Sequence, residues 1–212
     1  MNLFVKAFLL LLCSAFSFGM TKSHNPNTTA TIVIHGFNPD GVDLEGVFGE
    51  DVLDNSLLYQ VAEFAGLPVN DGSNTLPPNV IATTTYYGST PPSYYTSQDI
   101  TQLDAVTNQY GGGIPRYALI IAKYAEHIMN RSGAHQVNIV SASMGSFVGR
   151  WLIEKNSGQL ANEGKIARWL SLEGVLCGNW AASNDFVQDL WDDFGTPSVD
   201  VEQMNYAWVE TN

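Results

Sequence analysis

Residues 137–150 read VNIVSASMGSFVGR, and this stretch decides the fold. It begins within Gln136 to Val140, a short apolar run rich in β-branched residues that is typical of a buried strand. From Ser146 to Lys155 the apolar residues return at helical spacing. A strand that turns this sharply into a helix lifts one side chain above the edge of its sheet, and the residues beside it must be small. We therefore predict a tight turn that presents the hydroxyl of Ser143 at the start of a helix.

Outside this stretch, strand-like and helix-like patterns alternate along the chain. Strands are predicted over residues 30–34, 79–87 and 167–172, and helices over residues 51–65, 99–108 and 115–132, with a further amphipathic helix over residues 184–194. Alternation of strands and helices is typical of a parallel sheet whose crossover helices cover its faces. We therefore predict an α/β fold with a mostly parallel sheet of about four strands and helices on both faces.

Composition and charge restrict the class of protein and its partners. The chain has 212 residues, 45% of them hydrophobic, which suits a globular domain with its own core. Asp and Glu number 21 against 9 Lys and Arg, so the net charge is −12. Nucleic acids and anionic membranes need clustered positive charge, so neither is expected as an electrostatic partner.

The first 19 residues have the pattern of a secretory signal peptide. Lys6 precedes an apolar run from Ala7 to Phe16, and the small residues Ser17 and Gly19 follow. We expect cleavage near residue 20 and a secreted or periplasmic protein. The remaining chain divides into a core over residues 20–175 and a segment over residues 176–212, which is either a lid or the start of a C-terminal part.

Cleavage would leave Cys177 as the only cysteine, so no internal disulfide is possible. Cys177 also has no Cys or His neighbour at the spacing of a metal site, and we predict no bound metal.

A second motif, His35-Gly36-Phe37, follows the first predicted strand. In a parallel sheet its loop opens on the same edge as the turn at Ser143. The backbone N–H of Phe37 and that of Met144 can then face the same position and stabilise an oxyanion beside the Ser143 hydroxyl. This arrangement predicts a nucleophilic serine with a two-donor oxyanion hole.

Together, TIVIHGF over residues 31–37 and VNIVSASMGSFVGR resemble the lipases and esterases of the α/β-hydrolase superfamily, across residues 30–174. The resemblance implies a partial α/β-hydrolase fold in which the four strands are the central ones. It implies that Ser143 is the nucleophile, that Phe37 and Met144 form the oxyanion hole and that His35 is structural. Glu173, after the fourth strand, is a candidate for the acid, because some members of the family place their acid there. Four aspartates further along the chain are alternatives: Asp185, Asp189, Asp192 and Asp193.

The implied reaction is hydrolysis of a small-molecule or lipid ester through an acyl-enzyme. It requires no metal or organic cofactor. Transient contact with a lipid interface is expected, and the oligomeric state is left open.

The histidines do not follow the order of that family, in which the catalytic histidine comes after the nucleophile and the acid. All four precede Ser143, at positions 24, 35, 127 and 135. We expect a C-terminally truncated sequence with little turnover, whose histidine lies beyond Asn212. Two alternatives stay open: a non-catalytic binding protein with a vestigial Ser143, and an enzyme that uses His35 as its base.

The segment over residues 86–113 has two further features. Four tyrosines, at positions 86, 87, 94 and 95, either line an acyl pocket or cover the site, or else pack in the core and its loops. The run Gly111 to Gly113 lacks the Lys-Ser/Thr pair of a phosphate-binding loop, so it is interpreted as a flexible hinge.

Overall fold

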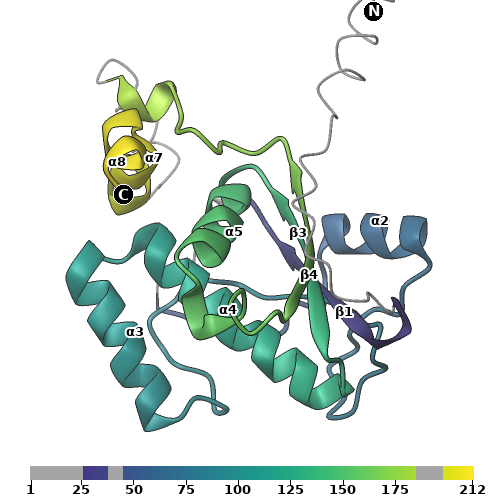
Figure 1. Ribbon diagram of the computed structural model, residues 1–212. Coiled ribbons are helices and arrows are strands. Elements are labelled where there is room, and N and C mark those ends of the chain that lie inside the picture. Colours follow the sequence, from purple (N-terminus) through teal and green to yellow (C-terminus); the bar gives the residue numbers. More distant parts are fainter. Residues whose placement is uncertain (1–25, 38–44, 185–197) are drawn as a thin grey trace, which may run out of the picture.

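The computed structural model describes residues 26–37, 45–184 and 198–212 (Figure 1). The predicted signal peptide and most of the helix predicted over residues 184–194 lie outside these ranges. The strands are β1 (Thr29–Ile34), β2 (Ile81–Thr83), β3 (Gln136–Ala142) and β4 (Ile166–Leu172). The helices are α2 (Ser56–Ala65), α3 (Ser97–Tyr110), α4 (Gly113–Ser132), α5 (Met144–Glu154), α7 (Ser198–Met204) and α8 (Tyr206–Thr211), with short 3₁₀ turns η1 (Pro26–Thr28), η3 (Ser157–Gln159) and η4 (Ala181–Ser183).

The strands form one parallel sheet in the order β2-β1-β3-β4. Ile34 at the end of β1 pairs with Ser141, and Leu172 at the end of β4 pairs with Ala142. The carboxyl ends of β1, β3 and β4 therefore lie side by side at one edge of the sheet. This edge carries both motifs that the sequence singled out.

Helices cover both faces of the sheet, as Figure 1 shows. On one face, Leu58 and Ala62 of α2 form a buried cluster with Val33, Ile81 and Val140. On the other face, the alternate strand residues join a larger core with α4 and α5, in which Ile32, Ile34, Ile139, Ile121 and Val148 are buried. The predicted α/β fold, with a parallel four-stranded sheet between helices, is confirmed.

Two elements are shorter than the sequence predicts. The helix predicted from residue 51 begins only at Ser56, because the side chain of Asn55 caps it by accepting from Leu58 N. Asp51 is instead paired with Arg131, whose Nη1 lies 2.8 Å from its carboxylate. Likewise β2 ends at Thr83, and the residues after it leave the sheet.

The run Gly111 to Gly113 is a defined turn rather than the predicted flexible hinge. Gly111 ends α3 in the left-handed conformation and Gly112 precedes α4, both with positive φ. The amide of Gln203 in α7 donates to the carbonyls of Tyr110 and Gly112 at 2.9 and 3.2 Å. A side chain on Gly113 would collide with Gln203, so the turn is packed against the C-terminal helices.

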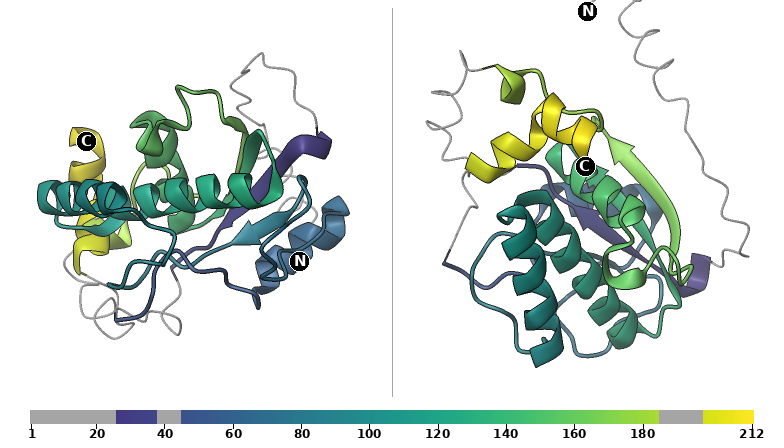
Figure 2. Two further views of the ribbon diagram at one scale, coloured as in Figure 1. Left: turned by 90° about the horizontal axis from the view of Figure 1, so that it is seen from below. Right: turned by 60° about the vertical axis from the view of Figure 1, so that its left-hand side comes forward.

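The C-terminal helices α7 and α8 lie over the ends of α4 and α5 (Figure 2). The ring of Trp208 in α8 packs at a tilt against Trp151, with centroids 5.2 Å apart, and contacts Phe147 edge-on. No helix among the described residues is long and apolar enough to cross a membrane.

Candidate active site

Ser143 occupies a strained turn between β3 and α5. Its backbone has φ 50° and ψ −125°, although positive φ is unfavourable for any residue with a Cβ. The turn is fixed on both sides: Ser143 N donates to the carbonyl of Leu172 at 3.0 Å, and Ser146 N donates to the carbonyl of Ser143 at 3.0 Å. The residue is exposed, and no hydrogen bond from the described part of the chain engages its hydroxyl. This is the predicted turn, with a free hydroxyl at its tip.

Two glycines allow the loops after β1 and β3 to touch. A Cβ on Gly36 would lie 3.0 Å from Cβ and 3.6 Å from Oγ of Ser143. A Cβ on Gly145 would collide with the carbonyl oxygen of His35. The His35-Gly36 loop and the first turn of α5 are therefore in backbone contact, and the structure brings the two sequence motifs together.

The contact between these two loops lies where the chain leaves neighbouring strands toward opposite faces of the sheet. The chain leaves β1 toward α2 on one face and leaves β3 toward α5 on the other. Ligands of open α/β sheets bind in the crevice that such a divergence leaves at the carboxyl ends of the strands. Ser143 stands at this position.

The predicted oxyanion donors belong to the same two loops. Met144 is the first residue of α5, where backbone N–H groups have no partner within the helix. Phe37 directly follows Gly36 and is half-buried against the core. The assignment of their N–H groups to one oxyanion stays a prediction.

His35 has the surroundings of a structural histidine. Its Nδ1 lies 2.6 Å from the carbonyl oxygen of Gly36, and its ring stacks on Tyr86 with centroids 4.2 Å apart. Burial lowers the pKa of His35, which keeps the imidazole neutral near neutral pH. Within the described ranges, no hydrogen bond joins it to Ser143.

The other histidines are engaged elsewhere or lie outside the described residues. His127 in α4 stacks on Tyr94 with centroids 3.9 Å apart. His135 directly precedes β3, at the opposite end of that strand from Ser143. His24 lies outside the described residues.

Glu173, the predicted acid, is exposed directly after β4 and has φ 50°. It shares the edge of Ser143, because Ser143 N bonds to the neighbouring carbonyl of Leu172. A Cβ on the next residue, Gly174, would lie 2.6 Å from Cβ of Ser146, so this turn packs on the start of α5. The catalytic role of Glu173 stays a prediction.

Sequence reasoning missed a buried polar network beneath the turn. The indole Nε1 of Trp169 donates to Oγ of Ser141 at 2.8 Å, and that hydroxyl lies 3.2 Å from Oγ of Ser146. Both serines are fully buried. Ser141 holds the first small position of the motif, and its polarity was the one signal of this network in the sequence.

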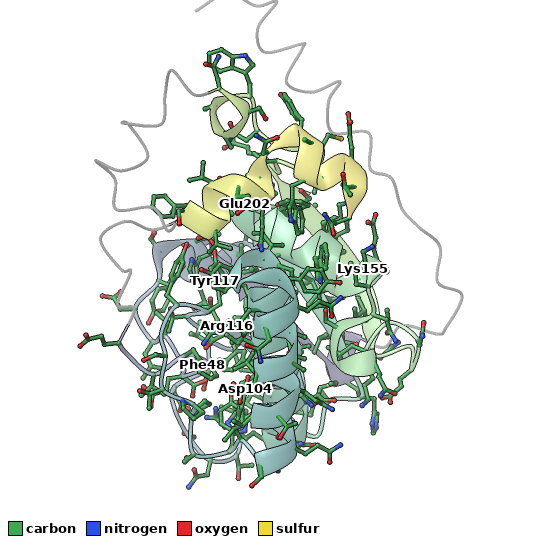
Figure 3. All side chains as sticks on the ribbon, turned by 90° about the vertical axis from the view of Figure 1, so that its left-hand side faces the viewer. Phe48, Asp104, Arg116, Tyr117, Lys155 and Glu202 are labelled. Atoms are coloured by element: carbon green, nitrogen blue, oxygen red, sulfur yellow. The ribbon has the colours of Figure 1, made fainter. Side chains whose placement is uncertain are left out.

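The tyrosines pack in the core and its loops. Tyr86 and Tyr87 are buried, and Tyr94 donates to the carbonyl of Gly49 at 2.7 Å. Figure 3 shows Tyr117 and Arg116 on α4, with Phe48 beside Arg116; the guanidinium lies 4.8 Å from the centre of that ring. These contacts favour packing over an acyl pocket.

One buried acid had no signal in the sequence. Asp200 of α7 is fully buried, and Tyr117 donates to its Oδ2 at 3.3 Å while Oδ1 has no partner among the described residues. Burial raises the pKa of Asp200 to about 7.

A hollow of about 610 Å³ lies between α3, α4 and the C-terminal end of α5. Tyr110, Trp151 and Lys155 are among the residues that line it. Ser143 is at the other end of α5, so this hollow does not belong to the candidate active site.

Comparisons with known proteins do not identify a family. No family model and no curated protein matches the chain. Among solved structures there is a weak likeness to the 2-hydroxy-6-oxo-6-phenylhexa-2,4-dienoate hydrolase of a Rhodococcus strain, with 16% identity and a TM-score of 0.35. It covers 72% of this chain and 40% of that protein, so the chain spans less than half the length of the hydrolase. At this level of similarity, nothing about activity or site residues carries over.

Proposed function

We propose that this chain carries the nucleophile of a serine hydrolase that cleaves carboxylic esters through an acyl-enzyme. The observation that carries the proposal is the backbone of Ser143, a non-glycine residue held at φ 50° with an exposed hydroxyl beside Gly36. Strain of this kind costs about 1–3 kcal/mol and persists where the surrounding structure enforces it, most often at functional sites. Glycine would adopt the same backbone conformation without strain, so the presence of serine at this position favours a role for its hydroxyl.

In the proposed reaction Oγ of Ser143 attacks the ester carbonyl and gives its proton to a base. The N–H groups of Phe37 and Met144 hold the oxygen that becomes negative. The base returns the proton to the departing alcohol. Water then attacks the acyl carbonyl and gives a proton to the base, and the base returns a proton to Oγ of Ser143 as the acid leaves.

Among the described residues, no histidine is hydrogen-bonded to the Ser143 hydroxyl. Nδ1 of His35 is already engaged by the carbonyl of Gly36. The proposal therefore assigns the base to a histidine that residues 26–37, 45–184 and 198–212 do not include, with Glu173 orienting it. The alternative that His35 itself acts through Nε2 predicts that His35→Asn abolishes Ser143 reactivity.

The second candidate function is a binding protein on the same scaffold, in which Ser143 is vestigial. It is favoured by one observation, that no described histidine bonds to the Ser143 hydroxyl.

For the enzyme, we propose a small-molecule or lipid ester as substrate and a secreted or periplasmic location.

Covalent labelling by a fluorophosphonate tests the proposal, because this probe reacts with activated serines. The product of the whole reading frame should be labelled on Ser143, and Ser143→Ala should abolish the label. Ser89→Ala, an exposed serine far from the turn in sequence, should leave the label unchanged. A folded full-length protein without the label would favour the binding protein.

A further inference from the structure

The carbonyl oxygen of Gly36 is held by two side chains at once. Nδ1 of His35 lies 2.6 Å from it, and the hydroxyl of Tyr86 lies 3.1 Å from it and 2.9 Å from the carbonyl oxygen of His35. Carbonyl oxygens only accept, so the phenol and the imidazole are the donors. The single hydrogen of the phenol is shared between the carbonyls of His35 and Gly36, of which the His35 oxygen is the nearer. The Gly36 oxygen has two lone pairs, so it can accept from the phenol and the imidazole together.

Tyr86 is itself rigidly placed. It is fully buried, and its ring lies between His35 and Tyr117, with centroids 4.2 and 4.7 Å away. Arg116 of α4 donates to the carbonyl of Gly88 at 2.8 Å and so fixes the segment that carries Tyr86. Burial raises the pKa of Tyr86, and its hydroxyl stays a donor across the physiological range.

The geometry of the peptide bond transmits this anchoring to Phe37. The carbonyl of Gly36 and the N–H of Phe37 belong to one trans peptide unit, in which they point in opposite directions. The side of Gly36 that lacks a Cβ faces Ser143. Fixing the carbonyl therefore fixes the direction of the N–H, and two accepted bonds polarise the peptide and strengthen the N–H as a donor.

We propose that Tyr86 is a positioning residue that aims and strengthens the Phe37 N–H toward the oxyanion beside Ser143. The inference rests on the proposed function, since the oxyanion exists only if Ser143 reacts. On this proposal the hydroxyl of Tyr86 contributes to the reaction although the residue is buried in the core.

The direct test follows the Phe37 amide by ¹⁵N NMR in Tyr86→Phe, with the resonance assigned through Phe37→Leu. The control is Tyr124→Phe, which also deletes a buried hydroxyl within hydrogen-bond distance of a carbonyl, that of Thr83 at 3.0 Å. The same hydroxyl lies 2.6 Å from Oδ1 of Asp51. We expect Tyr86→Phe to shift the amide resonance and Tyr124→Phe to leave it unchanged. An unmoved amide in Tyr86→Phe overturns the inference whether or not the protein is an enzyme.

Ester turnover by the product of the whole reading frame gives the second readout. Loss of one hydrogen bond behind the donor should lower kcat by roughly tenfold with KM unchanged. A kcat that falls equally in Tyr124→Phe, or that does not fall in Tyr86→Phe, contradicts the positioning role. Absence of Ser143-dependent turnover in the unmodified protein instead contradicts the proposed function, so the two failures are distinguishable.

Discussion

The carbonyl oxygen of His35 and the Cα of Gly145 lie so close that no side chain fits between them. This contact joins the loop after β1 to the first turn of α5, and it determines where Ser143 stands relative to Gly36. The conformation of the site is therefore set by backbone packing as well as by the turn itself.

Gly145→Ala should destabilise the protein by about 1–3 kcal/mol, because the new methyl group must displace the His35 carbonyl. Urea unfolding measures the change. Gly145 lies within α5 and has no positive φ, so alanine brings no backbone strain there and any loss reports the collision. A Gly145→Ala protein as stable as the unmodified one would show that the contact is not tight.

Ser143→Gly should be more stable than Ser143→Ala by about 1 kcal/mol, because only glycine tolerates positive φ without strain. Both variants lose the hydroxyl, so the comparison isolates the backbone of the turn. Thermal unfolding of the pair gives the answer. If alanine proves the more stable, the residue is not strained at this position.

The side chain of Ser141 is required for a hydrogen bond and not only for its small size. Ser141→Ala should cost about 1–3 kcal/mol, because it leaves the Trp169 indole N–H without its buried acceptor. Ser141→Ala combined with Trp169→Phe should recover part of this loss, since both partners are then removed. Denaturant unfolding of the single and double variants checks the coupling, and strictly additive losses would contradict it.

Asp200 should make stability depend on pH. Its pKa is about 7 in the folded protein, against about 4 for an unfolded aspartate, so the folded state holds the proton more tightly. The resulting stabilisation is complete below pH 4 and is lost as the pH rises through 7, a change of roughly 4 kcal/mol.

Asp200→Asn removes this dependence, so the difference in unfolding free energy between the variant and the unmodified protein should grow in favour of the variant from pH 4 to 7. Asp104→Asn, at an exposed acid of α3, is the control and should change stability little at any pH. A constant difference between Asp200→Asn and the unmodified protein across this range would argue against a buried, protonated Asp200.

The sequence predicts the parts of this site that depend on local constraints. The small residues between a strand and a helix predicted the turn at Ser143. The position of His35-Gly36 directly after the first strand predicted that this motif lies on the same edge of the sheet as Ser143. Both follow from rules that act within a few residues or from the geometry of parallel sheets.

The rest depends on residues that are distant in the chain. Asp51, which was predicted to lie in the helix that ends at Ala65, instead pairs with Arg131 eighty residues away. The bond from Tyr86 to Gly36 joins residues fifty positions apart, and Asp200 is one of 21 acids with nothing to distinguish it. Periodicity and propensity carry no information about such pairs.

Both hydrogen-bond donors proposed for the oxyanion are main-chain groups. Residue 37 can therefore change its side chain, proline excepted, without removing the donor. Phe37 is only half-buried, and its side chain packs against the core. A substitution at position 37 therefore separates the two parts of this residue: it alters the packing of the core and leaves the proposed main-chain donor in place.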